Sequence, residues 1–158
     1  MVVIAIIGIL GSVAIFSMRG YGDSQNPAAT ARAIQLAMFR ARTAALADGA
    51  QRRLTCTTSG CTYQMATTRG MSTPAAWTDS GNNVDVGNHA TIWSISSSTD
   101  AAVDGSAGTQ MGVSKTIRFF PDGSADPVTV YICDLNKQHK FKIYVYPGTG
   151  LARLVSNW

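Results

Sequence analysis

The chain opens with Met1-Val-Val-Ile-Ala-Ile-Ile-Gly-Ile-Leu-Gly-Ser-Val-Ala-Ile-Phe16, a stretch that contains no charged residue. As a helix it spans about 24 Å, slightly short of the ~20 residues that a full bilayer span needs. After Phe16 the sequence is rich in Gly, Ser and Thr, as is common in exported β domains. A hydrophobic helix joined to a polar head is typical of a membrane anchor or an assembly device. We therefore expect two parts, a helix over residues 1–23 and a globular head over residues 24–158.

The composition of the 158 residues excludes several classes of protein. Charged residues make up 14%, against about 25% in an average globular protein, and no Glu is present. The sequence has no dinucleotide-binding or P-loop motif and no zinc-ligand spacing. A nucleophilic site of Cys133, Asp134 and His139 is disfavoured, because adjacent strand residues point to opposite faces. We predict a protein that is not an enzyme and that holds no cofactor or metal.

Residues 27–48 carry the signals of a second helix. Asn26-Pro27 is a favourable helix start, and Asp48-Gly49 is a favourable end. Apolar residues recur at positions 34, 38, 41 and 45, which share one helical face. This narrow stripe of mostly small side chains suits packing against a sheet.

From residue 51 the hydrophobic period changes to two, which indicates β-strands. The predicted strands are Gln51–Cys56, Cys61–Ala66, Ala90–Ser96, Lys115–Phe120, Val128–Cys133, Lys140–Tyr146 and Leu151–Val155. Turn residues at 121–124 and 147–150 predict consecutive antiparallel strands towards the carboxyl end. Residues 67–89 and 97–114 are polar and are predicted to be loops. The fold class is α+β, in which the helix 27–48 covers an antiparallel sheet.

Three cysteines allow three pairings in principle. Cys56 and Cys61 flank the turn-forming sequence Thr-Thr-Ser-Gly, and cross-strand neighbours in a short hairpin are close enough to bridge. In an oxidising compartment we expect a Cys56–Cys61 disulfide that leaves Cys133 as a buried thiol.

Residues 1–15 resemble the conserved amino-terminal helix of type IV pilins and type II secretion pseudopilins. In that family a basic leader ending in Gly, and then Phe-Thr-Leu-Ile-Glu-Leu, precede this segment. Both are missing here, so we expect Met1 to be an internal methionine of a longer reading frame. The resemblance implies that the helix anchors the precursor in the inner membrane and later packs against other subunits in a filament. The apolar residues assigned to this role are Val2, Val3, Ile4, Ile6, Ile7, Ile9, Leu10, Val13 and Ile15.

Three further phrases, within residues 31–45, 117–125 and 143–150, resemble the minor subunits typified by general secretion protein H, FimT and FimU. The resemblance implies a structural subunit of a type IV pilus or of a type II secretion pseudopilus, acting in filament priming at the tip. Its partners would be other subunits, inner-membrane lipid and the inner-membrane assembly platform, with the head in the periplasm. Both machines share these motifs, so the choice between them stays open.

DNA binding is the alternative function. Some FimT-like subunits carry a Gly-Arg-x-Arg phrase that holds DNA, and the matching stretch here is Gly150-Leu-Ala-Arg153, which keeps only the second arginine. Phosphate contacts need only point charges at suitable spacing. The candidate cations are Lys137, Lys140, Lys142 and Arg153. We favour the simpler interpretation that these residues are solvated and protect a sheet edge from aggregation.

Overall fold

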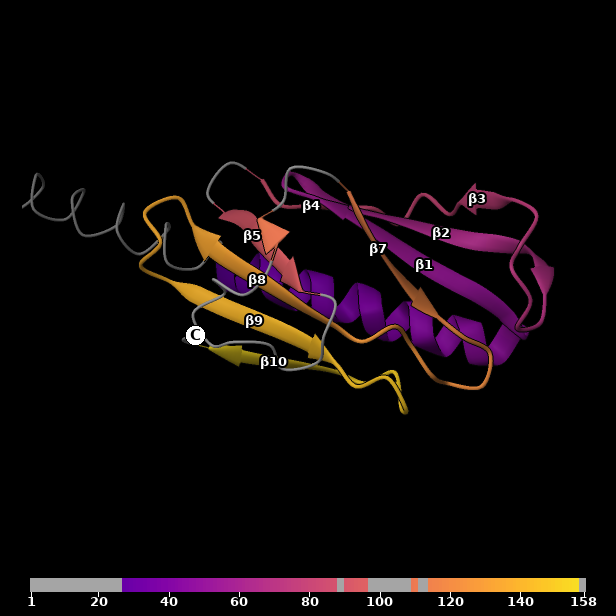
Figure 1. The fold of residues 1–158 in the computed structure, drawn as a ribbon. Coiled ribbons are helices and arrows are strands. Elements are labelled where there is room, and N and C mark those ends of the chain that lie inside the picture. Colours follow the sequence, from indigo (N-terminus) through magenta and orange to yellow (C-terminus); the bar gives the residue numbers. More distant parts are fainter. Residues whose placement is uncertain (1–26, 88–89, 97–108, 111–113, 157–158) are drawn as a thin grey trace, which may run out of the picture.

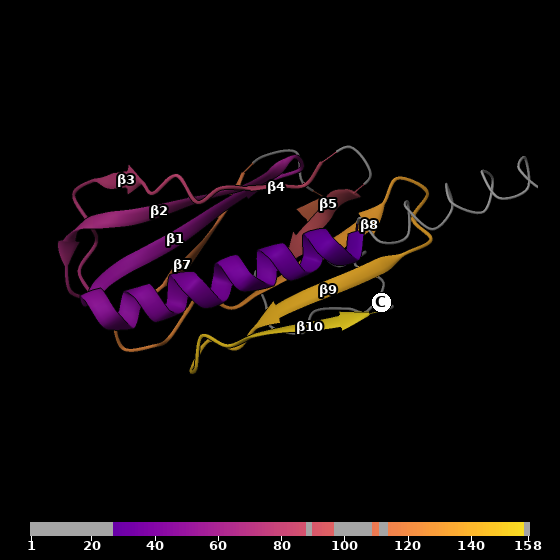
Figure 2. The same cartoon turned by 180° about the vertical axis from the view of Figure 1, so that it is seen from behind.

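The computed structural model describes residues 27–87, 90–96, 109–110 and 114–156. The hydrophobic helix predicted over residues 1–23, with all the apolar residues assigned to it, lies outside the described residues, as does most of the segment 97–114. Within the described part, one long helix lies against two antiparallel sheets (Figures 1 and 2).

The helix occupies residues 27–48, as the sequence predicts. Its buried face includes the predicted stripe, and fully buried Ala31 extends that stripe towards the amino end. Gly49 follows with a φ of 63°, the left-handed conformation that commonly ends helices and that glycine adopts at little cost. In Figure 2 the helix crosses in front of both sheets, so a single element closes one side of the core.

The first sheet has the order β3-β2-β1-β7, and a short β4 also pairs with β2. Its strands are β1 (Ala50–Thr57), β2 (Gly60–Arg69), β3 (Trp77–Asp79), β4 (Val84–Asp85) and β7 (Lys115–Phe119). Alternation along β1 places Leu54 and Cys56 inside the core and turns Arg53 and Thr55 away from it.

The second sheet has the order β10-β9-β8-β5-β6. Its strands are β5 (Ala90–Ser96), β6 (Thr109–Gln110), β8 (Val128–Asp134), β9 (Lys140–Val145) and β10 (Ala152–Ser156). Strand β8 is the central strand of this sheet, and every one of its residues is buried. Val130 and Ile143, which pair across β8 and β9, belong to the core cluster that contains the buried helix face.

Two expectations need correction. Strands β7 and β8 follow each other in sequence but belong to different sheets, because β7 pairs with β1 and the chain then crosses over to start β8. Short strands also lie in both predicted loops: the loop 97–114 contains β6, and the loop 67–89 contains the end of β2 and two short strands, β3 and β4. These strands are only three and two residues long and largely exposed, so no hydrophobic period marks them in the sequence.

Candidate functional site

An exposed apolar stripe runs along the outer face of the helix. Leu36, Phe39 and Leu46 are 47%, 54% and 43% exposed, and their spacing of three and seven residues places them on one face. This face lies away from the buried stripe, so the helix carries large apolar side chains on a second face, where exposed Arg32 and Thr43 lie among them. A group of large apolar side chains that stays exposed in the monomer is typical of a surface that contacts another molecule.

The carboxyl-terminal part of the chain is fixed beside this stripe. Gln35 Nε2 donates to the carbonyl of Ala152 at 3.1 Å, and Arg42 Nε donates to the carbonyl of Thr149 at 2.6 Å. A hollow of about 240 Å³ remains between the helix and the start of β10, lined by Leu36, Phe39 and exposed Leu151 among others. Apolar side chains therefore continue from the helix to Leu151 on the sheet edge, and the polar side chains of Arg32, Gln35 and Arg42 lie beside them.

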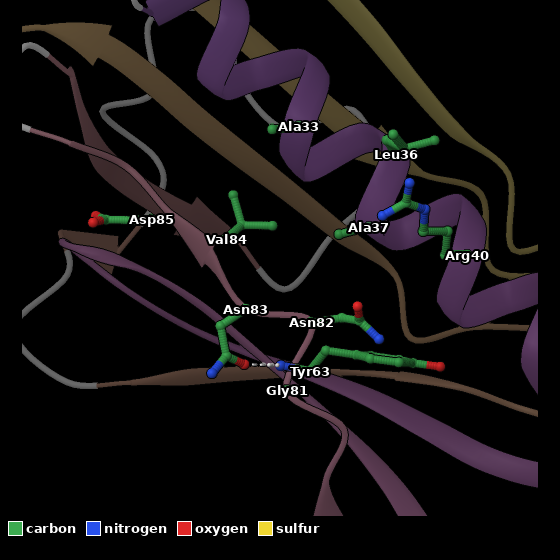
Figure 3. A pocket seen from close by; sticks show the side chains of 10 residues that line it. All are labelled: Ala33, Leu36, Ala37, Arg40, Tyr63, Gly81, Asn82, Asn83, Val84 and Asp85. Atoms are coloured by element: carbon green, nitrogen blue, oxygen red, sulfur yellow. Dashed lines mark hydrogen bonds between the residues drawn. The ribbon is translucent and has the colours of Figure 1, made fainter.

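A larger groove of about 760 Å³ lies on the other flank of the helix (Figure 3). Helix residues around Leu36 and Arg40 form one wall, and residues 81–85 with Tyr63 form the other. Asn83 Oδ1 accepts a hydrogen bond of 3.1 Å from the backbone N–H of Tyr63, which holds the second wall to β2. The lining mixes apolar, amide and charged groups and contains no nucleophile beside a base, so the groove suits docking rather than covalent chemistry.

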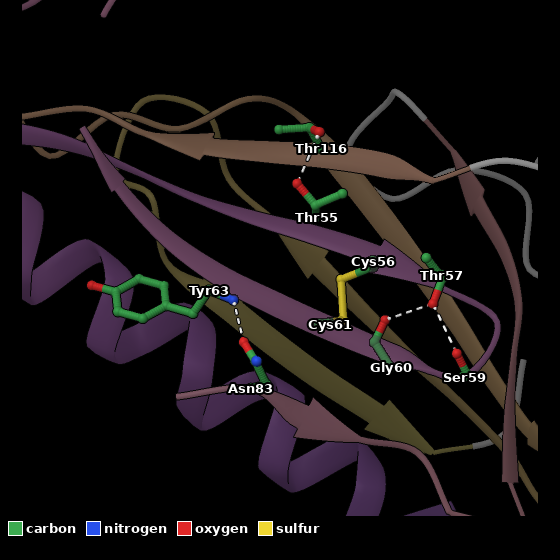
Figure 4. The surroundings of a disulfide bond; sticks show 9 residues. All are labelled: Thr55, Cys56, Thr57, Ser59, Gly60, Cys61, Tyr63, Asn83 and Thr116. Atoms are coloured by element: carbon green, nitrogen blue, oxygen red, sulfur yellow. Dashed lines mark hydrogen bonds between the residues drawn. A yellow bond between two sulfur atoms is a disulfide. The ribbon is translucent and has the colours of Figure 1, made fainter. Parts of the chain in front are cut away.

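The predicted disulfide is present. Cys56 and Cys61 are direct partners across β1 and β2, with Cα atoms 4.0 Å apart, and they form a bond inside the core (Figure 4). Cys133 is a buried free thiol, also as predicted. Burial raises the pKa of the Cys133 thiol, and the charge of Asp134 raises it further, so this cysteine is kept in its unreactive form.

Removal of the disulfide is expected to lower the free energy of unfolding, because the bond constrains the unfolded chain. The loss should be only about 2 kcal/mol, because the loop that the bond closes is short. Urea unfolding of a Cys56→Ala/Cys61→Ala double variant measures this change. Alkylation of the unfolded, non-reduced wild-type protein should modify one cysteine, Cys133. A reductant should lower the free energy of unfolding of the wild type and leave that of the double variant unchanged. Alkylation of all three cysteines in the non-reduced protein would contradict the bond.

The four candidate DNA-binding cations do not share one environment. Lys137 lies in the β8–β9 turn, with its Nζ 3.9 Å from the centroid of the Trp93 ring. Lys142 is buried on β9, and its Nζ lies 5.8 Å from the centroid of the Tyr144 ring. Exposed Arg153 pairs with Tyr144 across β9 and β10, and interactions with Tyr144 and Tyr146 raise the pKa of its guanidinium. The register places Lys140, Lys142 and Arg153 on one face of the second sheet, which also carries the tyrosines.

Asp134 organises the β8–β9 turn. Its carboxylate accepts hydrogen bonds from the backbone N–H groups of Gln138 and His139 and lies 3.0 Å from His139 Nδ1. Burial acts to raise the pKa of Asp134, but the hydrogen bonds from His139 and Gln138 outweigh it and lower that pKa. The side chain of His139 contacts Asp134, whereas Cys133 lies on the opposite face of the strand, so the three do not form a catalytic arrangement. Across the described residues, no three His, Cys, Asp or Glu side chains gather as metal ligands would.

The lowered pKa of Asp134 predicts how the stability of the protein depends on pH. Because the folded pKa of Asp134 lies below its unfolded value of about 3.9, its charge stabilises the fold fully above that pH. This contribution is lost as the pH falls through the folded pKa. An Asp134→Asn variant should be less stable than the wild type at pH 7, and it should lose less stability between about pH 5 and pH 2. Urea unfolding at each pH tests this, and equal acid slopes in the two proteins would contradict it.

The exposed helix stripe was not predicted as a functional surface, although its signal is present in the sequence. The periodic apolar positions 34, 38, 41 and 45 predict the face that packs on the sheet, whereas Leu36, Phe39 and Leu46 fall outside that period. Large apolar side chains on a second face of the helix suit a second partner, because the sheets cover only the buried face. In the part of the chain that is described, no helix combines the length and apolar character needed to cross a bilayer.

Comparison with known proteins gives a consistent result. The sequence model of the family described as type II transport protein GspH matches residues 30–149. The solution structure of Escherichia coli GspH is similar with a TM-score of 0.57 and 12% sequence identity, covering 84% of this chain and 89% of that one. The minor pseudopilin EpsH from the type 2 secretion system of Vibrio cholerae has a TM-score of 0.57 and 11% identity, covering 83% and 97% respectively. No curated protein matches the chain.

Proposed function

Because the chain belongs to the type II transport protein GspH family, it is a structural pseudopilin and not an enzyme, and we propose that it primes filament assembly at the tip of a type II secretion pseudopilus. The observation that carries this proposal is the exposed stripe of Leu36, Phe39 and Leu46 on the helix. A subunit that starts a filament must present a surface to the next subunit before any neighbour is in place.

The position of the helix in the chain also defines the proposed orientation of the subunit relative to the membrane. The stripe lies on the helix 27–48, which follows the hydrophobic segment 1–16. The segment proposed to anchor the subunit is therefore followed directly by the surface proposed to contact the next subunit. In this arrangement the segment 1–23 inserts in the inner membrane and later packs among the helices of other pseudopilins, and the head projects into the periplasm. The inner-membrane assembly platform is the further partner that this position implies.

Filament counts in cells that overproduce the major pseudopilin test the priming role. A protein that initiates assembly controls how many filaments form, whereas one needed for growth controls how long they become. Deletion of this protein should therefore reduce the number of filaments, and secretion of the exported proteins should fall. Normal numbers of shorter filaments would contradict priming.

A matched pair of variants links that result to the stripe. Phe39→Asp places a charge in the apolar contact and should reproduce the deletion. Leu135 is also a large exposed apolar residue, but it lies in the turn after β8 and not on the helix. Leu135→Asp should leave the filament number unchanged. Equal effects of the two variants would contradict docking through the helix stripe.

DNA uptake is the alternative on the same fold. The partial Gly-Arg-x-Arg phrase and the shared face of Lys140, Lys142 and Arg153 support it, whereas the burial of Lys142 and the engagement of Arg153 with tyrosines favour a structural role. Gel-shift measurement of the protein with duplex DNA distinguishes the two. Retention of DNA that is lost on Arg153→Ala would select the uptake function, and we expect no retention.

A further inference from the structure

A small pocket on the first sheet combines arginines with aromatic side chains. It has a volume of about 210 Å³ and lies where β1 and β7 meet the loop that follows β2. Its charged residues are Arg53 and Arg118, and its apolar walls come from Met71, Pro74, Trp77 and Phe120. Arg53 is on the face of β1 that points away from the core, so this pocket is separate from the helix stripe. In Figure 1 the helix lies behind these strands.

The loop that closes the pocket is held in place by one buried side chain. Gln51 is 2% exposed, and its Nε2 donates to the carbonyl of Met71 at 2.9 Å and to that of Ser72 at 2.8 Å. These bonds fix the chain around Met71 and Pro74 beside the strands. The wall is therefore built before any ligand arrives, which lowers the entropic cost of binding.

The charges in the pocket are not balanced. Arg53 and Arg118 are direct partners across β1 and β7, a position in which like charges destabilise a sheet. Arg118 is neutralised by Asp126, which accepts its Nε at 2.8 Å and one terminal nitrogen at 3.1 Å. Arg53 has only the neutral Gln64, whose Oε1 accepts its Nε at 2.7 Å. Among the described residues, the two terminal nitrogens of Arg53 have no acceptor.

The surroundings of Arg53 strengthen an ionic contact there. Its guanidinium lies 4.2 Å from the centroid of the Trp77 ring, which orients it, and partial burial lowers the pKa of the group. A partly desolvated guanidinium with two unused donor groups is a strong binding site for a carboxylate, which accepts two parallel hydrogen bonds from it.

We propose that this pocket binds a short segment of a partner protein in which a carboxylate side chain lies beside an aromatic side chain. The carboxylate contacts the terminal nitrogens of Arg53, and the neighbouring ring packs on Phe120, Met71 and Pro74. The volume suits one or two side chains, because sites for whole small molecules are usually 300–1,000 Å³. Trp, Phe, Met and Arg are also the residues enriched at the centres of protein interfaces.

Nucleic acid fits the pocket less well. Stacking of bases needs open aromatic faces, and here Arg53 covers a face of Trp77. The carboxylate of Asp126 beside Arg118 would also repel a phosphate backbone. A protein segment that brings a single carboxylate satisfies the one uncompensated charge.

The test uses the full chain in detergent, with ¹⁵N-labelled tryptophan, and an acetylated, amidated peptide of sequence Gly-Asp-Phe-Gly. The indole N–H signal of Trp77, assigned by a Trp77→Phe variant, should shift in a saturable way. A peptide with Asn in place of the Asp residue should bind at least about tenfold more weakly, because the charge-assisted bonds are lost. Oligodeoxythymidine should leave the Trp77 signal in place.

Variants of the protein make the test specific to this site. Arg53→Gln should weaken peptide binding by about tenfold or more, whereas Arg69→Gln, at the exposed end of β2, removes the same charge elsewhere and should have little effect. Arg53→Lys keeps the charge without the planar fork and should give intermediate affinity, which provides a second reading if Arg53→Gln folds poorly. Equal binding of the Asn peptide, equal effects at Arg53 and Arg69, or a Trp77 shift with the oligonucleotide alone would each overturn the proposal. The pocket and the helix stripe lie on different elements, so failure here is distinguishable from failure of the priming role.

Discussion

Replacement of Phe119 by Ala is expected to lower the free energy of unfolding by about 4 kcal/mol, because it leaves a large cavity in the core. Phe119 lies on β7, is fully buried and belongs to the hydrophobic cluster that joins both sheets to the helix. A small domain is stable by only about 5–15 kcal/mol, so this one change removes a large share of the total. Urea unfolding followed by circular dichroism measures the difference.

Phe39→Ala is the matched control for this variant. The same atoms are removed from a side chain that is 54% exposed on the helix, and Ala is the better helix former. We expect a change within about 0.5 kcal/mol. The pair separates two roles of phenylalanine in this protein, since Phe119 acts in stability and Phe39 is proposed to act in assembly. Equal destabilisation by the two variants would contradict the assignment of Phe119 to the core.

Gly150→Ala is expected to lower the free energy of unfolding by about 3 kcal/mol, for two additive reasons. Gly150 has a φ of 61°, a conformation that costs an alanine about 1 kcal/mol or more. A Cβ at this position would lie 2.5 Å from the carbonyl oxygen of Gly123 and 3.2 Å from Cδ of Arg42. Backbone and helix side chain meet here, so neither neighbour can move away without disturbing the join between the turn and the helix. Thermal or urea unfolding of the variant tests the prediction.

Gly148 offers a control within the same turn. An added Cβ at Gly148 would have no atom within 4 Å. Gly148→Ala should change stability by less than about 0.5 kcal/mol, since it also reduces the freedom of the unfolded chain. If both alanine variants are equally stable, the turn does not pack on Arg42 and Gly123 as described.

Much of the architecture was predictable because its signals are local. The helix 27–48 follows from a buried stripe and from Gly49 at its end, and all seven predicted strands exist with boundaries shifted by at most a few residues. The Cys56–Cys61 disulfide was predictable from a turn sequence between two cysteines, because the hairpin itself sets their separation. Short exposed strands such as β3 were not predictable, since pairing with β2 and not their own composition makes them strands.

The candidate functional surfaces were predictable only in part. The cations at 137, 140, 142 and 153 were identified as a group, but their burial depends on which face of the second sheet each occupies. The pocket around Arg53 had no signal in the sequence, because its residues come from positions 51 to 120 and meet only through the pairing of β1 with β7. Nothing local to Arg53 indicates that another arginine lies opposite.

The sequence by itself determined the helix 27–48, the seven predicted strands, the turns at 121–124 and 147–150, and the Cys56–Cys61 bridge. These properties depend on neighbours along the chain, through periodicity, φ preferences and loop length. The tertiary structure alone decided that β7 joins β1 while β8 joins β5 and β9 in the second sheet, that one helix covers both sheets, and that Arg53 faces Arg118. These outcomes depend on contacts between residues far apart in sequence, whose free energy arises only when the strands are brought together in the folded core.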